Sequence, residues 1–176
     1  MPTPYPRIER WRLPQAACEL TRSAVMPAGR RGVESGVFWL GDRAATSAIT
    51  AVAHPTGEGV EETPFSWRVS PEVYAAIARW ARPRGLTLLA VAHVHLSEAR
   101  PRLSPTDRSQ GLKVQHALSV ILPRGGREPN PKAWGWFVYE GAEYRELPPA
   151  EAAVRIARTG DDVEFVVIGA RGTEAT

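Results

Sequence analysis

The feature that most constrains this chain is an apolar run that ends in two histidines separated by one residue. Residues 86–92 read LTLLAVA, and His93 and His95 follow on either side of Val94. A run this apolar predicts a β-strand that is buried on both faces. Side chains alternate between the two faces of a strand, so His93 and His95 are expected to share one face. The sequence therefore predicts a sheet with two imidazoles at the carboxyl end of one strand.

A predicted helix start follows this strand after a loop. Ser104, Pro105 and Asp107 occupy the N-cap, first and third positions, where these residue types are favoured. Eleven residues separate His95 from Asp107, enough for the helix start to fold back over the strand end. We therefore expect His93, His95 and Asp107 to converge with a fourth corner open. Three protein ligands and a water surround a catalytic zinc ion in this way, although each motif alone is typical of an ordinary strand or helix cap.

A glutamate upstream adds a third element to this pattern. Glu34 opens the segment ESGVFWLG, which has the form E-x-G-x-x-x-L-G and predicts an apolar strand. A hydrolase with a zinc-bound water needs a carboxylate beside that water to act as general base. Glu34 is the candidate for this role, as a residue that does not itself bind the metal.

In this order, Glu34, His93-x-His95 and Ser104-x-x-Asp107 resemble the JAMM signature of the MPN-type zinc metalloproteases. The resemblance implies that His93, His95 and Asp107 bind Zn²⁺. It also implies that Glu34 activates the water and that Ser104 helps to stabilise the tetrahedral intermediate.

The resemblance covers roughly residues 24–123 and departs from the family pattern in two places. The family usually has Ser or Thr between the two histidines and Pro after them, where this chain has Val94 and Leu96. The spacing from the second histidine to the aspartate is also one residue longer than usual. The extra residue falls within residues 97–102, a predicted loop, where an insertion costs little free energy.

The activity that the resemblance implies is zinc-dependent hydrolysis of an amide or isopeptide bond at the carboxyl terminus of a ubiquitin-like protein, in deconjugation or precursor processing. The implied partners are that protein or its conjugate as substrate, with E1-like activating and E2-like conjugating enzymes in the same pathway. Two alternatives stay open: a metal-free MPN scaffold that only binds partners, and an MPN protein associated with DNA repair. The intact Glu34, His93, His95 and Asp107 argue against the first, and the lack of a basic arm argues against the second.

Composition and charge indicate the number of domains, the partners that are not expected and the location of the protein. A chain of 176 residues with 43% hydrophobic and 23% charged residues is expected to form one globular domain. The net charge of +3 contains no long block of like charge, so no nucleic-acid partner is expected. Cys18 is the only cysteine, so no internal disulfide can form. The first residues lack the apolar core of a signal peptide, and no run approaches the ~18 apolar residues of a membrane span. We therefore expect a cytoplasmic protein with no membrane partner.

The expected fold is α/β in the broad sense. A single MPN/JAB-like domain contains a mixed, mostly antiparallel β-sheet flanked by helices, with zinc at a strand–helix junction. The domain is expected over residues 13–169, after an extended lead-in at 1–12 and before a flexible tail at 170–176. The periodicity of apolar residues predicts strands at 33–40, 48–53, 65–69, 86–95, 119–123, 133–139, 143–147 and 163–169 and helices at 71–81, 105–118 and 149–158. The pattern of residues 14–28 is ambiguous with a helical look, and the resemblance implies a helix there, before the strand that carries Glu34.

Several segments outside the signature carry weaker expectations. Residues 55–63 are acidic and are expected to form a solvated, mobile loop. His54 and His116 are expected to serve hydrogen bonding or structure rather than metal binding. The aromatic side chains of Trp134–Tyr139 are expected in the core, with a substrate groove as the alternative. Arg100 and Arg102 are candidates to meet an acidic patch on the substrate.

Overall fold

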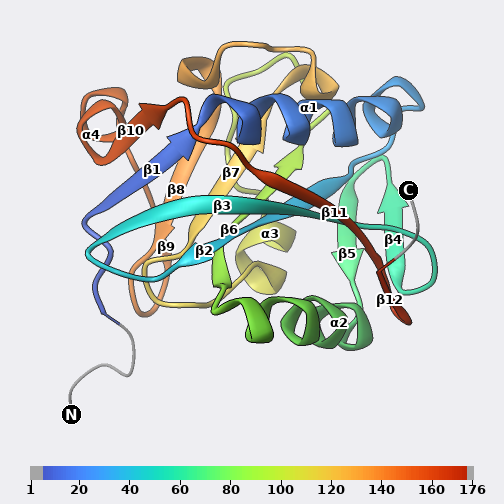
Figure 1. The fold of residues 1–176 in the computed structure, drawn as a ribbon. Helices are drawn as coiled ribbons and strands as arrows, with labels where there is room; N and C mark the ends of the chain where they lie inside the picture. Colours follow the sequence, from blue (N-terminus) through green and yellow to red (C-terminus); the bar gives the residue numbers. More distant parts are fainter. Residues whose placement is uncertain (1–5, 174–176) are drawn as a thin grey trace.

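A mixed β-sheet runs through the whole molecule and separates its helices into two groups (Figure 1). The structure, a computed structural model, describes residues 6–173. The sheet has ten strands, eight of which follow the order β10-β1-β3-β2-β6-β7-β8-β9, while β11 pairs with β3 and with β12. Strands β4 and β5 form a separate two-stranded sheet. Six of the ten strand pairs within residues 6–173 are antiparallel, which confirms the predicted mixed, mostly antiparallel arrangement.

The strands are β1 (Arg10–Pro14), β2 (Gly36–Asp42), β3 (Thr46–Pro55), β4 (Val60–Thr63), β5 (Ser66–Val69), β6 (Thr87–Val94), β7 (Leu118–Leu122), β8 (Gly135–Tyr139), β9 (Tyr144–Glu146), β10 (Ile156–Thr159), β11 (Glu164–Gly169) and β12 (Gly172–Thr173). The α-helices are α1 (Gln15–Arg30), α2 (Pro71–Ala81), α3 (Pro105–Gln110) and α4 (Pro149–Arg155). Short 3₁₀ turns occur at Arg82–Arg84, Arg124–Gly126 and Pro131–Ala133. Within residues 6–173, no helix is long and apolar enough to cross a membrane.

The centre of the sheet is formed by β2, which pairs in antiparallel fashion with β3 on one side and β6 on the other. Six successive residues of β2 are buried, because helices cover both faces of the sheet at this point. The strands predicted at 33–40 and 48–53 thus form the hairpin of β2 and β3, and the predicted buried strand before the histidines is confirmed. Adjacent residues of β2 face opposite sides, so Trp39 and Phe38 belong to different apolar clusters.

Helix α1 covers one of these clusters and helix α2 covers the other (Figure 1). On the α1 face, the indole of Trp39 donates a hydrogen bond of 2.8 Å to the hydroxyl of Thr21, which itself donates to the Ala17 carbonyl at 2.7 Å. These bonds satisfy the polar groups of two fully buried side chains. On the α2 face, Val73 and Ile77 of the predicted helix 71–81 are buried, as their spacing of four residues along one helix face favours.

The structure corrects several predicted boundaries. The segment 10–14, expected in part as a lead-in, is strand β1 between β3 and β10, and its Trp11 is fully buried. The predicted loop 55–63 contains β4, which pairs with β5. The segment 149–158, predicted as one helix, changes at Ile156 into strand β10, because this segment pairs with the distant β1. Of the predicted tail, residues 172–173 form β12, and 174–176 lie outside the described residues, as do 1–5.

The predicted helix 105–118 is much shorter than expected. Helix α3 ends at Gln110, and Gly111 after it adopts an extended conformation. Residue 116, predicted near a helix end, instead lies in a turn with a φ of 61°. Gly111 is closely packed at this point: a Cβ there would lie 2.5 Å from both the Asp107 carbonyl oxygen and the Tyr144 hydroxyl.

Candidate metal centre

Strand β6 brings both histidines to one end of the sheet. It pairs with β2 on one side, where His93 lies opposite Gly36, and with β7 on the other, where His93 lies opposite Ile121. His95 follows the last strand residue and stays extended, because its N–H donates to the Leu122 carbonyl and its carbonyl accepts from the Gly125 N–H, both at 2.9 Å. Backbone hydrogen bonds thus fix the main chain at both histidines.

Helix α3 supplies the third residue through its first turn. The Asp107 N–H donates to the Ser104 hydroxyl at 3.1 Å, and the Ser104 N–H donates to Asp107 Oδ2 at 2.7 Å. This reciprocal pair is a capping box, and it satisfies two backbone donors at the helix start. It also fixes the direction of the Asp107 carboxylate, which points out of the helix toward the strand end.

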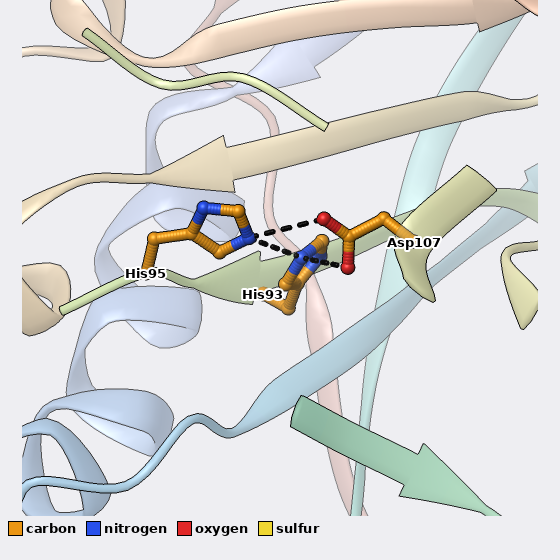
Figure 2. Close-up of side chains that lie close together, drawn as sticks. All are labelled: His93, His95 and Asp107. Carbon is orange, nitrogen blue, oxygen red and sulfur yellow. Dashed lines mark hydrogen bonds and ion pairs between the residues drawn. The ribbon is translucent and has the colours of Figure 1, made fainter. Parts of the chain in front are cut away.

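The two histidines and the aspartate meet as the sequence predicts (Figure 2). His93 Nε2 lies 3.1 Å from Asp107 Oδ1, and His95 Nε2 lies 3.2 Å from Asp107 Oδ2. The two Nε2 atoms are 3.1 Å apart. The side chains are 7%, 17% and 14% exposed for His93, His95 and Asp107, so the cluster is largely buried but open on one side.

This donor set fits a zinc ion. Two imidazole nitrogens and one carboxylate oxygen are common ligands of catalytic zinc. Ligand atoms at about 2.0–2.1 Å from a tetrahedral ion are roughly 3.3 Å from one another. The separations of 3.1–3.2 Å between the Nε2 and carboxylate atoms come close to this value. The residues can therefore hold a metal ion with only small movements of their side chains.

Asp107 and His95 each favour the charged form of the other. Burial raises the pKa of Asp107, but hydrogen bonds to His93 and His95 outweigh it and hold this pKa far below its usual range. Burial lowers the pKa of His95, but its hydrogen bond and proximity to Asp107 outweigh that effect and raise the pKa overall. The carboxylate therefore remains ionised, which is the form that binds a cation.

Glu34 lies beside this cluster. Its N–H donates to the Thr63 carbonyl at 2.8 Å, and the N–H of Val94 donates to the carbonyl of Ser35 at 3.0 Å, so the pairing of β2 with β6 continues beyond Gly36. Glu34 is only 7% exposed. Burial raises the pKa of its carboxyl, the nearby His95 and His93 oppose this rise, and the negative charge of Asp107 adds to it. A raised pKa makes Glu34 a stronger base than an exposed glutamate.

The hydroxyl of Ser104 has a structural task as the helix cap. Its oxygen accepts the bond from the Asp107 N–H. A hydroxyl that accepts one hydrogen bond can still donate its own proton to a second group. The structure thus places Ser104 next to Asp107, a candidate metal ligand, and the predicted catalytic role of Ser104 stays a prediction.

A cleft of about 110 Å³ opens beside the cluster and was not predicted from the sequence. His93 and Asp107 form one end of it, and the aromatic rings of Trp67 and Tyr74 form another part of its wall. Both rings pack against Phe38, with centroids 5.5 and 5.2 Å away. The strand that holds Trp67 was predicted, but its position beside the histidines depends on contacts between distant segments.

The other residues that the sequence singles out lie outside the cluster of His93, His95 and Asp107. Trp134 and Trp136 are buried in the core, as the favoured prediction for this strand states. The guanidinium of Arg100 pairs with the Glu146 carboxylate. His54 lines a second cavity on the other face of the sheet. His116 lies in the turn before β7, and the parallel pairing of β7 with β6 begins at Leu118 and Ala90, before β6 reaches His93.

Comparison with known proteins bears on the fold. No family model and no curated protein matches this sequence. The solution structure of protein DSY2949 from Desulfitobacterium hafniense is similar with a TM-score of 0.52 and 15% identity, over 78% of this chain and 87% of that chain. A JAB1/MPN domain protein, AF2198 from Archaeoglobus fulgidus, is a more distant structural neighbour, with a TM-score of 0.42 and 12% identity over 89% of this chain and 97% of that chain. The first similarity shows a shared fold, and the second is too distant to support an argument about function.

Proposed function

We propose that this chain is a JAMM-type zinc hydrolase that cleaves amide or isopeptide bonds. The observation that carries the proposal is the convergence of His93, His95 and Asp107 on one point, with the buried Glu34 beside them. These four residues come from the three separate parts of the predicted signature. A metal-free scaffold would have no need to keep four ionisable groups together in a largely buried site.

The residues of the chain divide the chemistry between them. When bound, Zn²⁺ supplies a water of lowered pKa and polarises the scissile carbonyl. Glu34 accepts the proton of the attacking water and passes it to the leaving amine. Ser104 donates its hydroxyl proton toward the carbonyl oxygen as negative charge develops there. Asp107, His93 and His95 would hold the metal ion in a fixed position, because backbone hydrogen bonds fix the chain at all three residues.

The proposed substrate is the carboxyl-terminal tail of a ubiquitin-like protein joined through an amide or isopeptide bond. The cleft between Trp67, Tyr74 and the metal ligands is narrow, so it suits an extended peptide with small side chains. The indole Nε1 of Trp67 is buried and has no hydrogen-bond partner among residues 6–173. It is therefore available to donate to a main-chain carbonyl of such a tail.

The test is cleavage of a panel of ubiquitin-like proteins, each carrying a carboxyl-terminal amide or isopeptide fusion. Products are resolved on a gel, and mass spectrometry gives the cut site. We expect cleavage after the last residue of the ubiquitin-like body, lost on addition of a zinc chelator and recovered with zinc. Cleavage of unstructured peptides at many positions, independent of a folded body, would instead indicate a general peptidase.

Glu34→Gln tests the role of the base. This change removes the proton acceptor but keeps the shape of the side chain, so turnover should fall by about 10²–10⁴-fold. Zinc content should stay near one ion per chain, because Glu34 is not a ligand. The matched control is Glu19→Gln, an exposed glutamate on α1, which should leave both quantities unchanged. Loss of zinc together with activity in Glu34→Gln would show that Glu34 binds the metal.

A further inference from the structure

A second cavity, of about 390 Å³, lies away from the metal ligands. The end of α1 forms one wall, through Ala28 and Arg31, while the end of β3 and strand β4 form the others. Its volume lies within the range of about 300–1,000 Å³ that is typical of small-molecule sites. The cleft beside His93 and Asp107 is less than a third of this size.

This cavity and the metal centre lie on opposite faces of one short segment. Val37 and Trp39 face the cluster under α1, and Phe38 faces the cluster under α2. Alternation along the chain extends this pattern to Ser35, which lines the cavity beside α1, and to Glu34, which interacts with the metal-site residues. The two residues are neighbours in sequence, so an occupant of the cavity sits directly behind the proposed base.

The hydroxyl of Ser35 indicates that the cavity has a ligand. Ser35 is 1% exposed, and its Oγ has no hydrogen-bond partner within the described part of the chain, residues 6–173. A buried hydroxyl without a partner costs about 1–3 kcal/mol in folding free energy. Such a group in the wall of a cavity of this size is suited to bond with a molecule that enters it.

The charges around the cavity define the class of that molecule. Arg31 and Glu62 both line it and form an ion pair of 3.0 Å with each other. Their charges cancel, so this pair offers a donor and an acceptor side by side without a net charge. The polar residues His54 and Thr56 also line the cavity. Ala24, Pro27 and Val60 add an apolar surface. A neutral, compact molecule with an amide group matches this wall, because an amide also presents a donor beside an acceptor.

We propose that this cavity is a binding site for a small neutral amide, held by Ser35 Oγ in the interior and by the Arg31–Glu62 pair at the opening. A carboxylate of the same shape binds less well, because it has no N–H to donate to Glu62 and loses its water at a wall whose charges cancel. The site is distinct from the metal centre and does not require a bound metal. Because Ser35 adjoins Glu34, binding at this site also changes the surroundings of the proposed base.

Amide ¹H–¹⁵N spectra of the full chain test this proposal. Nicotinamide and benzamide are the probes, and nicotinate and benzoate are their matched carboxylates. We expect both amides to shift the signals of Glu34, Ser35 and Gly36 saturably at concentrations up to about 10 mM, the range for molecules of this size. The carboxylates should bind at least about tenfold more weakly, as expected for a charge that loses its water at a wall without net charge and has no N–H for Glu62.

Ser35→Ala provides the decisive variant. It should fold with a slightly raised melting temperature, because an unpaired buried hydroxyl is removed, and should bind both amides about tenfold more weakly. The control is Ser119→Ala, a serine of similar burial that lines the other cleft, which should bind them as the wild type does. The proposal is overturned if neither amide shifts these signals, if the carboxylates bind equally well, or if Ser35→Ala keeps full affinity.

Discussion

Asp107 combines two tasks at the scale of single residues. Its carboxylate closes the capping box with the Ser104 N–H through Oδ2, and both of its oxygens face the two histidines. A negatively charged residue in the first turn of a helix is also stabilised by the helix dipole. The geometry of the metal site therefore depends on the local stability of α3, and the cap residue Ser104 supports that stability.

Ser104→Ala measures the structural part of this role. Loss of the side-chain cap should lower the free energy of unfolding by about 1 kcal/mol, measured by urea denaturation. The control is Ser70→Ala, since Ser70 occupies the N-cap of α2 without a side-chain cap bond and should cost clearly less. Equal losses in the two variants would show that the bond between Ser104 and Asp107 contributes little to stability.

Cys18 gives a prediction about pH. Burial raises the pKa of this thiol from 9.0 to about 11, although Arg158 lies 2.9 Å from the sulfur and acts in the opposite direction. The folded state thus holds the thiol proton more tightly than the unfolded state. The resulting stability is complete below pH 9.0 and is lost as the pH rises toward about 11.

Two measurements check this behaviour of Cys18. Alkylation of the folded protein should be far slower than alkylation of the urea-unfolded chain at the same pH, because the thiolate is the reactive form. The free energy of unfolding should decrease between pH 9.0 and about 11, and Cys18→Ala should reduce that decrease. Rapid alkylation of the folded protein below pH 9.0 would contradict the raised pKa.

At the scale of elements, the end of α3 packs closely against its surroundings. A Cβ at Gly111 would overlap both the Asp107 carbonyl and the Tyr144 hydroxyl. The Tyr144 hydroxyl donates to the Leu112 carbonyl at 2.7 Å. Tyr144 lies on β9, the last strand in the order of the sheet, so this strand holds the segment that follows α3. The contact supports the helix that carries Asp107, the candidate metal ligand.

Gly111→Ala should therefore disturb both stability and the metal site. Overpacking at this point is expected to cost about 1–3 kcal/mol of unfolding free energy. Because the strain acts on the carbonyl of Asp107, zinc affinity should fall as well, as measured by competition with a chromogenic chelator. The control is Gly160→Ala, where an added Cβ meets nothing within 4 Å. An unchanged zinc affinity in Gly111→Ala would mean that α3 adjusts without moving its carboxylate.

The success of sequence-based prediction also varies by element. Strand β6 and helix α2 were predicted correctly, because an apolar run and a capped amphipathic pattern are local signals. The hairpin of β4 and β5 was only half predicted, since the VEET sequence of β4 is polar and its pairing partner decides its structure. The local pattern of 149–158 predicts helix throughout, but residues 156–159 form strand β10, because they pair with β1, which is far away in the sequence.

At the scale of the whole molecule, one sheet joins the two sites described above. Its central strands are apolar on both faces and separate the cluster under α1 from the cluster under α2. The residues of the metal centre were predicted from motif order, and the structure brings His93, His95 and Asp107 together. The second cavity and the cleft beside Trp67 were not predicted, because their walls come from segments that meet only in the folded chain.

The central claim is that His93, His95 and Asp107 hold one zinc ion. The most direct measurement is the zinc content of the protein purified without chelator, by elemental analysis, followed by zinc titration of the chelator-treated protein. We predict one zinc per chain for the wild type and none for His95→Ala, which should still fold with a moderately lower melting temperature, since a chain of 176 residues buries a sufficient core without metal. A wild-type protein that carries no zinc and binds none on titration would contradict this account.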